Sequence, residues 1–261
     1  MKKSAHFNQY NELDQLLHRL GLSTFRDRYQ ALAEGHEKMG KSCLAFLHDL
    51  CSQESEHRDA IKKERLLKTA KLPRHKIITD FEISRIPSLS KAFIERLATG
   101  EFMDQAVNLL VFGVPGTGKT HLCIALAREW CLMGRKVLFK SASQLIEDLR
   151  QAQANHALHT YIKQLDKFEC LILDDISYIP LEKADTSVLF QLINERYERR
   201  SMVITSNLSF SSWENIFPDK ITAVAAIDRL VHHSEILELN APSYRIAKSQ
   251  KASKAGLVKT L

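Results

Sequence analysis

The 261-residue chain is poor in the residues that mark fibrous, low-complexity and metal-stapled proteins. Nine glycines and six prolines are too few for a collagen-like or low-complexity chain. Five cysteines form no C-x-x-C pair, and an odd number without zinc spacing indicates reduced, partly buried thiols. The first residues contain no apolar stretch of the secretory type, and the longest apolar run, around 109–114, is too short to span a membrane. We therefore expect a cytoplasmic protein with no membrane segment.

The residues that are present suit a folded globular chain. Hydrophobic residues make up 44% and charged residues 26%, which is close to the average and excludes wholesale disorder. A chain of this length has room for one large domain with a helical appendage.

The net charge of +6 is unevenly distributed. Residues 1–76 hold fifteen Lys/Arg against ten Asp/Glu, and residues 77–238 hold seventeen against twenty-one. After Glu238 there are five Lys/Arg and no acid. Two basic segments flanking a mildly acidic core are typical of a protein that binds a polyanion, most often nucleic acid. The alternative is a solubilising tail and a solvated helix face.

The first seventy residues have helical periodicity. Leucines recur at near-helical spacing, and we expect three helical stretches, over 13–32, 42–51 and 54–71. Pro73 ends the last of them, and 72–79 is interpreted as a linker. The pattern predicts a small all-α domain over 1–72.

Beyond the linker the pattern changes to alternating strands and helices. Apolar runs predict strands at 107–112, 136–140, 170–173, 202–205 and 235–239. Helices are predicted between them at 119–133, 143–153, 156–164 and 186–199. Nearly continuous apolar strands separated by helices indicate an α/β fold, with a parallel five-stranded sheet sandwiched by helices.

A complete phosphate-binding motif, G-x-x-x-x-G-K-T, lies between the first strand and its helix. It consists of Gly113, Val114, Pro115, Gly116, Thr117, Gly118, Lys119 and Thr120, followed by His121. Glycines let backbone amides curl around phosphates, and the start of the helix adds partial positive charge. Lys119 should reach the β- and γ-phosphates, and the Thr120 hydroxyl should ligate Mg²⁺. The motif predicts a P-loop NTPase that binds ATP with Mg²⁺.

Two acids follow the third strand, in the sequence CLILDD. Asp174 is placed to hold Mg²⁺, partly through water, and Asp175 to polarise the attacking water. The strand–helix unit over 136–153 lies between the P-loop and these acids in the chain. We expect the strand of that unit to separate the P-loop strand from the acidic strand.

Two polar residues further on extend the predicted site. Asn207 follows the fourth strand and should end beside Asp175, where it could orient the lytic water or sense the γ-phosphate. Arg229 is a lone arginine in an apolar segment, and it could stabilise charge on the γ-phosphate of a neighbouring subunit. An intramolecular pair with Asp228 or another acid explains Arg229 equally well.

These segments together resemble a known family. They are GVPGTGKTHL, LILDD with YIPL after it, LFQLINERYERRSMVITSNLSFSSW, AAIDRLVHH and SYR. Over roughly residues 70–245 they closely resemble the IstB-like transposition helper ATPases, in the initiator branch of the AAA+ superfamily near DnaC and DnaA. The first seventy residues resemble the small leading domain of that family less distinctively.

The resemblance implies an ATP-dependent homo-oligomer on double-stranded DNA that recruits or activates a transposase. Lys119 and Thr120 then match the Walker A motif, Asp174 and Asp175 the Walker B motif, and Asn207 the first sensor. Arg229 matches the arginine-finger region, and Arg245 a second basic position near the nucleotide or the next subunit. The domains would be a partner- or DNA-binding domain over 1–72, an AAA+ core over 73–246 and a basic tail over 247–261. Such a protein would be cytoplasmic, and nucleoid-associated when on DNA.

One residue departs from the family pattern, because many IstB-like chains carry Asp-Glu where this chain carries Asp174-Asp175. The shorter second acid favours slow hydrolysis that serves as a switch. Two alternatives stay open: a DnaC-like loader acting on a replicative helicase, and an ATP-binding adaptor that does not hydrolyse.

Several other features are interpreted as structural. His232 and His233 have no acid or cysteine spacing that supports a metal site, so we expect packing or surface roles. Trp213, Phe210 and Phe217 are expected in the core. The insertion over 143–165, with Arg150 and Lys163, matches the region that contacts DNA in the initiator branch.

Overall fold

The computed structural model describes residues 2–72, 76–87, 89–178, 181–208, 212–213, 218 and 220–244. The chain divides into two compact units, residues 1–65 and 66–261. None of the helices within the described ranges is long and apolar enough to cross a membrane.

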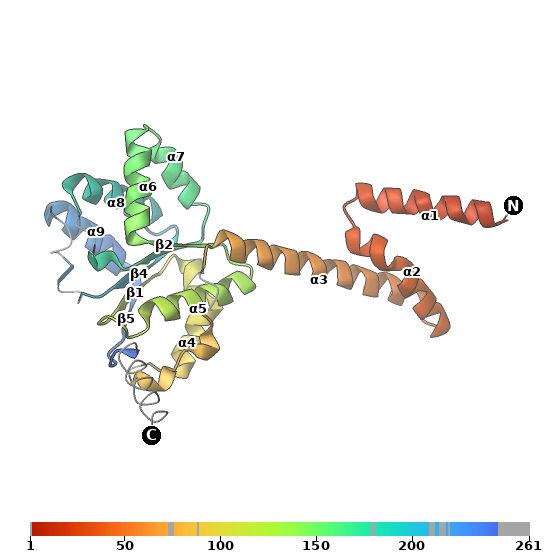
Figure 1. Cartoon of the computed structure of the whole chain (residues 1–261), viewed down its shortest axis with the longest axis horizontal. Helices are drawn as coiled ribbons and strands as arrows, with labels where there is room; N and C mark the ends of the chain where they lie inside the picture. Colours follow the sequence, from red (N-terminus) through yellow and green to blue (C-terminus); the bar gives the residue numbers. More distant parts are fainter. Residues whose placement is uncertain are drawn as a thin grey trace, which may run out of the picture. The chain divides into compact units, whose positions relative to one another are not determined.

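The first unit is entirely helical. It contains α1 (Lys2–Arg19), α2 (Ser23–Lys38) and most of α3 (Cys43–Thr69), which meet in a small apolar core of Leu17, Tyr29 and Leu50 (Figure 1). A turn at Gly21, where φ is +67°, separates α1 from α2 within the predicted stretch 13–32. The predicted stretches 42–51 and 54–71 are one helix, because neither glycine nor proline lies between them to break it.

The second unit is built on a parallel five-stranded sheet. Its strands are β1 (Asn108–Phe112), β2 (Val137–Ser141), β3 (Cys170–Asp174), β4 (Ser201–Ser206) and β5 (Ser234–Glu238), in the order β2-β3-β4-β1-β5 (Figure 1). The prediction of five parallel strands is confirmed. The expected sheet order is wrong, because β4 rather than β2 lies between the P-loop strand β1 and the acidic strand β3. The order of the strands along the chain does not specify which of them lies between β1 and β3 in the sheet.

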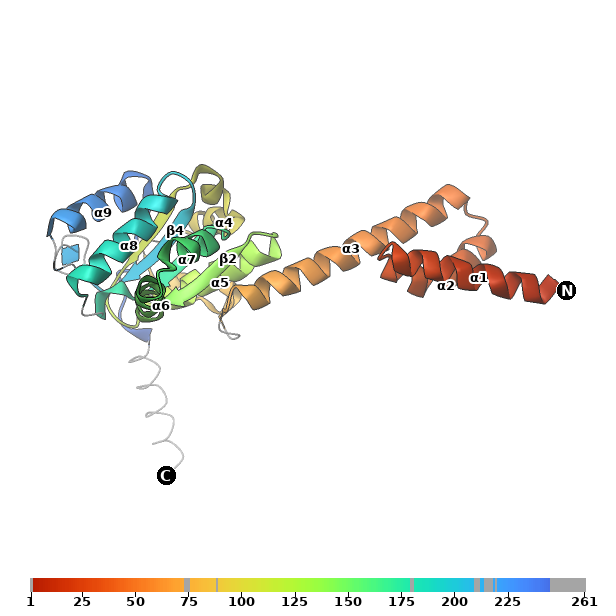
Figure 2. The same cartoon turned by 90° about the horizontal axis from the view of Figure 1, so that it is seen from above.

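Helices cover both faces of this sheet (Figure 2). One layer holds α4 (Lys91–Thr99) and α5 (Lys119–Leu132), and the other holds α6 (Ala142–Ala154), α7 (Leu158–Leu165), α8 (Lys183–Arg196) and α9 (Lys220–His232). Four 3₁₀ helices, Ile78–Asp80, Ile83–Arg85, Glu101–Gln105 and Ile176–Tyr178, complete the described elements.

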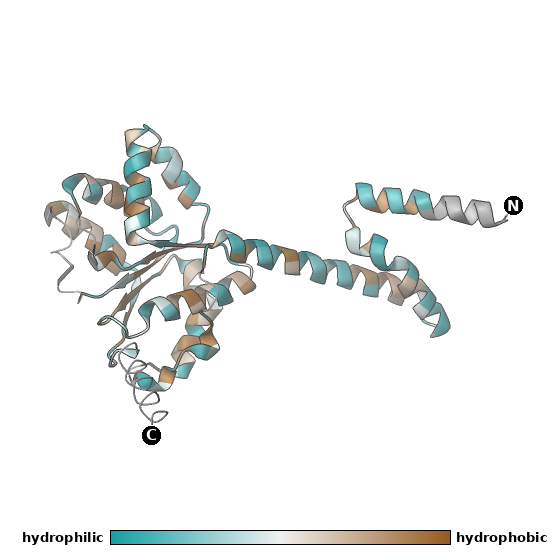
Figure 3. Cartoon of the chain, in the orientation of Figure 1, coloured by the Kyte–Doolittle hydropathy of each residue, from teal (hydrophilic) through white to brown (hydrophobic). Residues whose placement is uncertain are grey.

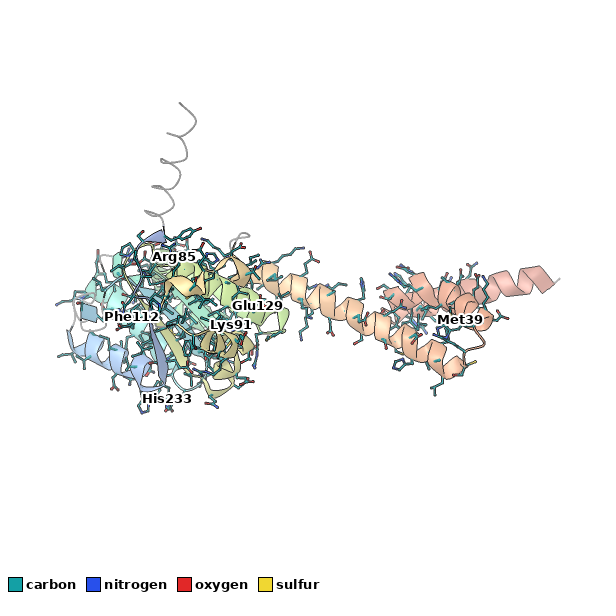
Figure 4. All side chains as sticks on the ribbon, turned by 90° about the horizontal axis from the view of Figure 1, so that it is seen from below. Met39, Arg85, Lys91, Phe112, Glu129 and His233 are labelled. Carbon is teal, nitrogen blue, oxygen red and sulfur yellow. The ribbon has the colours of Figure 1, made fainter. Side chains whose placement is uncertain are left out.

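Apolar side chains along β1 point alternately to the two faces of the sheet, so both faces need a covering layer of helices. Leu109 and Val111 face the core under α4 and α5, whereas Leu110 and Phe112 face the core under α6 to α9. The strands are predominantly hydrophobic, while the helices mix hydrophobic and hydrophilic faces (Figure 3). All five residues of β1 are buried, and Figure 4 shows Phe112 within the second unit. A strand apolar on both faces is stable only between two helical layers.

The topology gathers three loops at one edge of the sheet. β1, β4 and β3 are adjacent and parallel, so their carboxyl ends lie side by side. The P-loop follows β1, Asp175 follows β3 and Asn207 follows β4. This edge is where open parallel sheets place their ligands.

Candidate nucleotide-binding site

A cavity of about 670 Å³ lies at the carboxyl edge of the sheet. Three groups of residues line it: Pro115 to His121 of the P-loop and α5, Asp175 with Thr205 and Asn207 at the strand ends, and two segments at 76–86 and 241–244. A cavity of this size with convergent polar groups suits a small-molecule or cofactor ligand.

The P-loop turns sharply between β1 and α5. Gly118 is the N-cap residue of α5 with φ of +103°, and a Cβ there would lie 2.9 Å from Phe81 Cε2. Both the conformation and the close approach therefore require glycine. The first amides of α5 have no intrahelical acceptor, and a glycine cap offers no side chain to bind them. Amides in this position bind anions such as phosphate.

Lys119 is held at the base of this loop. It is 6% exposed, and its Nζ donates to the carbonyl oxygens of Gly113 at 2.6 Å and Val114 at 3.1 Å. Nζ also donates to Asn207 Oδ1 at 2.5 Å. The ammonium thus lies where the P-loop, β1 and β4 meet, beside the amides that open α5.

Asp174 ends β3 within reach of two threonine hydroxyls. Thr120 Oγ1 lies 3.0 Å from each of its carboxylate oxygens, and Thr205 Oγ1 donates to Oδ1 at 2.7 Å. A carboxylate and a hydroxyl in contact at the start of α5 are hard oxygen donors of the kind that Mg²⁺ prefers. The chemistry of this donor set fits the predicted metal.

Asp175 is fixed by its neighbours in an uncommon backbone conformation. Its φ is +64°, and its backbone N–H donates to Thr205 Oγ1 at 2.8 Å. Its Oδ1 accepts from Asn207 Nδ2 at 2.6 Å. Non-glycine residues with positive φ are uncommon, although aspartate tolerates the conformation better than most. The structure thus brings Asp175, Asn207 and Lys119 together in one chain of contacts.

The loop that carries Asn207 is anchored from behind. Its backbone N–H donates to Ser177 Oγ at 2.7 Å, and Ser177 Oγ lies 2.8 Å from Ser206 Oγ. Trp213, which is fully buried as expected, donates from Nε1 to Ser206 Oγ at 2.9 Å. Phe210 and Phe217 lie outside the described residues.

Sequence reasoning missed the two segments that close the cavity. Phe81 packs edge-on against His121 at 5.6 Å between ring centroids. The Tyr244 N–H donates to the Gly116 carbonyl at 2.9 Å, and the Arg85 guanidinium lies 4.9 Å from the centre of the Tyr244 ring. Figure 4 labels Arg85 on the second unit. Neither segment carries a chemical motif, and only the SYR sequence of the family resemblance pointed to the second of them.

Arg229 does not line the cavity of its own chain. Its guanidinium lies 5.0 Å from the ring centre of Phe190 and 6.0 Å from that of Tyr197, and it donates to the Ala225 carbonyl at 3.0 Å. Among the described residues no carboxylate forms an ion pair with Arg229. The alternative of an intramolecular pair with Asp228 is therefore wrong. Arg245 and the tail lie outside the described residues.

The two vicinal histidines have an acidic neighbour that their sequence spacing does not show. Glu198, His232 and His233 are exposed, and their potential ligand atoms lie within 4.8 Å of one another, which no other such group does in the described ranges. His233 Nε2 lies 3.2 Å from Glu198 Oε1, and His232 Nδ1 lies 2.9 Å from Tyr197 Oη. Figure 4 shows His233 at the surface. Each ring thus has one nitrogen within hydrogen-bond distance of a neighbouring side chain.

Two further expectations concern side chains away from the cavity. Arg150, in the segment expected to contact DNA, forms a bidentate pair with the buried Asp185 at 2.5 and 2.6 Å, while its own side chain stays 42% exposed. All five cysteines are free, and they divide into exposed Cys43 and Cys51 and three buried thiols.

Comparison with known proteins identifies the family. The family described as IstB-like ATP binding protein matches residues 15–252. A protein of Sinorhizobium fredii named as an insertion sequence ATP-binding protein is 38% identical over 253 residues, covering 95% of this chain and 85% of that protein. A Pseudomonas aeruginosa protein named as an ATP-binding protein of insertion sequence IS21 is 35% identical over 242 residues, covering 93% of this chain and 91% of that protein.

Solved structures show the same fold at low identity. DnaI superimposes with a TM-score of 0.55 at 18% identity, over 69% of this chain and 98% of that chain. AMPPCP-bound DnaA from Aquifex aeolicus gives 0.54 at 17% identity, over 70% of this chain and 56% of that chain. The expected fold, a P-loop NTPase fold of the AAA+ type, is confirmed. The family match spans most of the chain, so this protein belongs to the family of IstB-like ATP-binding proteins.

Proposed function

We propose that the chain hydrolyses ATP with Mg²⁺ in the cavity at the carboxyl edge of the sheet. The observation that carries the proposal is the convergence of Lys119, Asp174, Asp175 and Asn207 from the ends of three adjacent strands. Triphosphate chemistry needs a cation, a metal ligand, a base and an orienting amide at one place.

Each residue has a defined part in this reaction. Lys119 would exchange its loop carbonyl acceptors for the β- and γ-phosphates, because the phosphate oxygens carry more charge than carbonyls. Thr120 and Asp174 would hold Mg²⁺, which neutralises charge on the triphosphate. Asp175 would accept a proton from water attacking the γ-phosphorus while the bond to the β–γ bridging oxygen breaks, giving ADP and phosphate. Asn207 would orient Asp175 through its 2.6 Å hydrogen bond.

We further propose that ATP-bound chains assemble on double-stranded DNA and recruit or activate a transposase. Support comes from the names of the relatives, which assign them to insertion sequences. It also comes from charge, since α3 carries exposed cations at residues 62, 63, 65 and 68. Lysines and arginines on one helix are suited to contacts with a phosphate backbone. The first unit and the tail would then serve DNA or the partner.

The experiment that tests DNA binding is a salt titration. Binding of duplex DNA should require ATP and weaken steeply with salt, because phosphate contacts release counterions. Deleting the tail after Ala247 removes four lysines, so the slope of log K against log salt should fall by up to about four units if all four contact phosphates. ATP-independent binding would contradict the proposal, and an unaltered slope would leave the tail without a role on DNA.

Arg229 is proposed to complete the site of a neighbouring subunit. It lies away from its own cavity, it has no ion-pair partner among the described residues, and the rings of Phe190 and Tyr197 support its guanidinium. Arg229→Ala should bind ATP but lose hydrolysis and ATP-dependent assembly. Mixing it with Lys119→Ala should restore activity, because each variant supplies the half that the other lacks. A folded Arg229→Ala protein that assembles normally would refute the shared site.

A further inference from the structure

One hydroxyl on β4 contacts both acids that follow β3. Thr205 Oγ1 donates to Asp174 Oδ1 at 2.7 Å and accepts from the backbone N–H of Asp175 at 2.8 Å. Thr205 is 1% exposed, so bulk water does not compete for either bond. We propose that Thr205 is a positioning residue that aims the metal-binding carboxylate and fixes the backbone of the base at the same time. The inference rests on the ATP hydrolysis proposed above.

The first of these bonds orients Asp174 independently of the P-loop. Thr120, the other hydroxyl on this carboxylate, comes from α5 and is itself a proposed metal ligand. Thr205 comes from β4 and does not share that role, so its bond can persist while Thr120 changes partners. Groups that hydrogen-bond a ligating carboxylate set its orientation and basicity. Thr205 therefore occupies the outer shell of the proposed metal site.

The second bond holds Asp175 in its uncommon conformation. The ladder between β3 and β4 ends at the Leu173–Ile204 pair, so the Asp175 N–H lies beyond the paired residues. The Thr205 hydroxyl serves as its acceptor where the ladder has ended. A backbone at φ of +64° persists only where its surroundings over-determine it. Losing this acceptor would let Asp175 relax and move its carboxylate away from Asn207.

Among residues of this size, only a hydroxyl can perform both functions. A threonine or serine hydroxyl donates one hydrogen bond while accepting others, whereas valine has the shape of threonine and can do neither. Serine retains the hydroxyl and loses only the methyl group that restricts its rotation. Substitutions at 205 therefore separate hydrogen bonding from packing.

The test compares Thr205→Val and Thr205→Ser with Thr186→Val as a matched control. Thr186 in α8 is also 1% exposed, but its hydroxyl donates to the carbonyl of Glu182, the N-cap residue of that helix, and Thr186 does not line the cavity. Two readouts are measured on the full chain: binding of a fluorescent ADP analogue with Mg²⁺ and with EDTA, and steady-state ATP hydrolysis.

We expect Thr205→Val to bind the analogue in EDTA as the wild type does. Its apparent Mg²⁺ affinity and its kcat should each fall about 10- to 100-fold, as for other outer-shell partners of metal ligands. Both quantities in Thr205→Ser should stay within about threefold of the wild type, because the hydroxyl that bonds the metal-binding carboxylate is kept. Thr186→Val should match the wild type. Should Thr205→Val not fold, Thr205→Ala removes the same hydroxyl.

Two results would overturn the inference. One is wild-type Mg²⁺ dependence and kcat in the variants that lack the hydroxyl. The other is a Thr205→Ser protein as defective as Thr205→Val, since packing would then explain the loss. A wild-type chain that binds no nucleotide would instead refute the proposed function, so the two failures are distinguishable.

Discussion

Asn207 contacts both the cation and the proposed base of the site, so its removal should slow hydrolysis more than it weakens binding. Asn207→Ala deletes the 2.5 Å bond from Lys119 and the 2.6 Å bond to Asp175. Lys119 keeps its two carbonyl acceptors, Gly113 and Val114, so the P-loop should stay intact.

The size of the effect follows from the bond to Asp175. A hydrogen bond to a charged group contributes about 1.5–3 kcal/mol, and about 1.4 kcal/mol changes a rate tenfold. Losing the bond that aims the base should therefore lower kcat about 10- to 100-fold. The KM for ATP should change less than about threefold, because binding depends on the P-loop amides and Lys119.

Single-turnover hydrolysis of radiolabelled ATP measures this loss without interference from product release. Asn194→Ala is a matched control, because Asn194 is exposed on α8. An Asn207→Ala protein that hydrolyses ATP at the wild-type rate would refute the assignment of Asn207 as the residue that orients Asp175.

Three further predictions use other parts of the chain. Asp175→Asn should keep ATP binding but lower kcat at least about 100-fold, since a general base contributes that much; unchanged turnover in a rapid-quench assay would exclude it as the base. The pKa of buried Asp185 is lowered, chiefly by hydrogen bonds from Arg150. The ionised Asp185 therefore stabilises the fold fully above its unfolded pKa, and this stabilisation is lost as pH falls through the lower folded pKa. Asp185→Asn should flatten the decline in Tm below about pH 5, and an unchanged decline would count against the Arg150–Asp185 pair. Ellman's reagent should label only Cys43 and Cys51 in the native protein, because the other three thiols are buried and burial raises their pKa; rapid labelling of a third would contradict the fold.

The strand ends of this site were predictable because its chemistry needs particular residues at fixed spacing. The P-loop has a recognisable sequence pattern, and two acids that directly follow an apolar strand, as Asp174 and Asp175 do, indicate a metal ligand and a base. Parallel strands bring their carboxyl ends to one edge of the sheet, so the place of Asn207 after its strand predicts that it lies at the same edge as Asp175. Their direct contact also requires that β4 lie next to β3.

Other features of the site and fold depend on tertiary contacts that sequence patterns do not encode. Thr205 lies in a strand where threonine is an ordinary β-former, so nothing in its neighbourhood marks it as a partner of two acids. The position of β4 between β1 and β3 depends on how the chain returns to the sheet, which chain order leaves open. Glu198 approaches His232 and His233 only through the packing of α8 against α9.

ATP binding by the P-loop is tested most directly by a calorimetric titration of ATP and Mg²⁺ into the wild type, Lys119→Ala and Lys91→Ala. Lys119 is buried among the P-loop carbonyls, whereas the Lys91 side chain is 81% exposed on α4 (Figure 4). We expect one ATP site per chain in the wild type and in Lys91→Ala. In Lys119→Ala, affinity should fall at least about 100-fold, which corresponds to the loss of two charge-assisted bonds of about 1.5 kcal/mol each. Equal affinity in all three proteins would contradict the claim that this P-loop binds ATP.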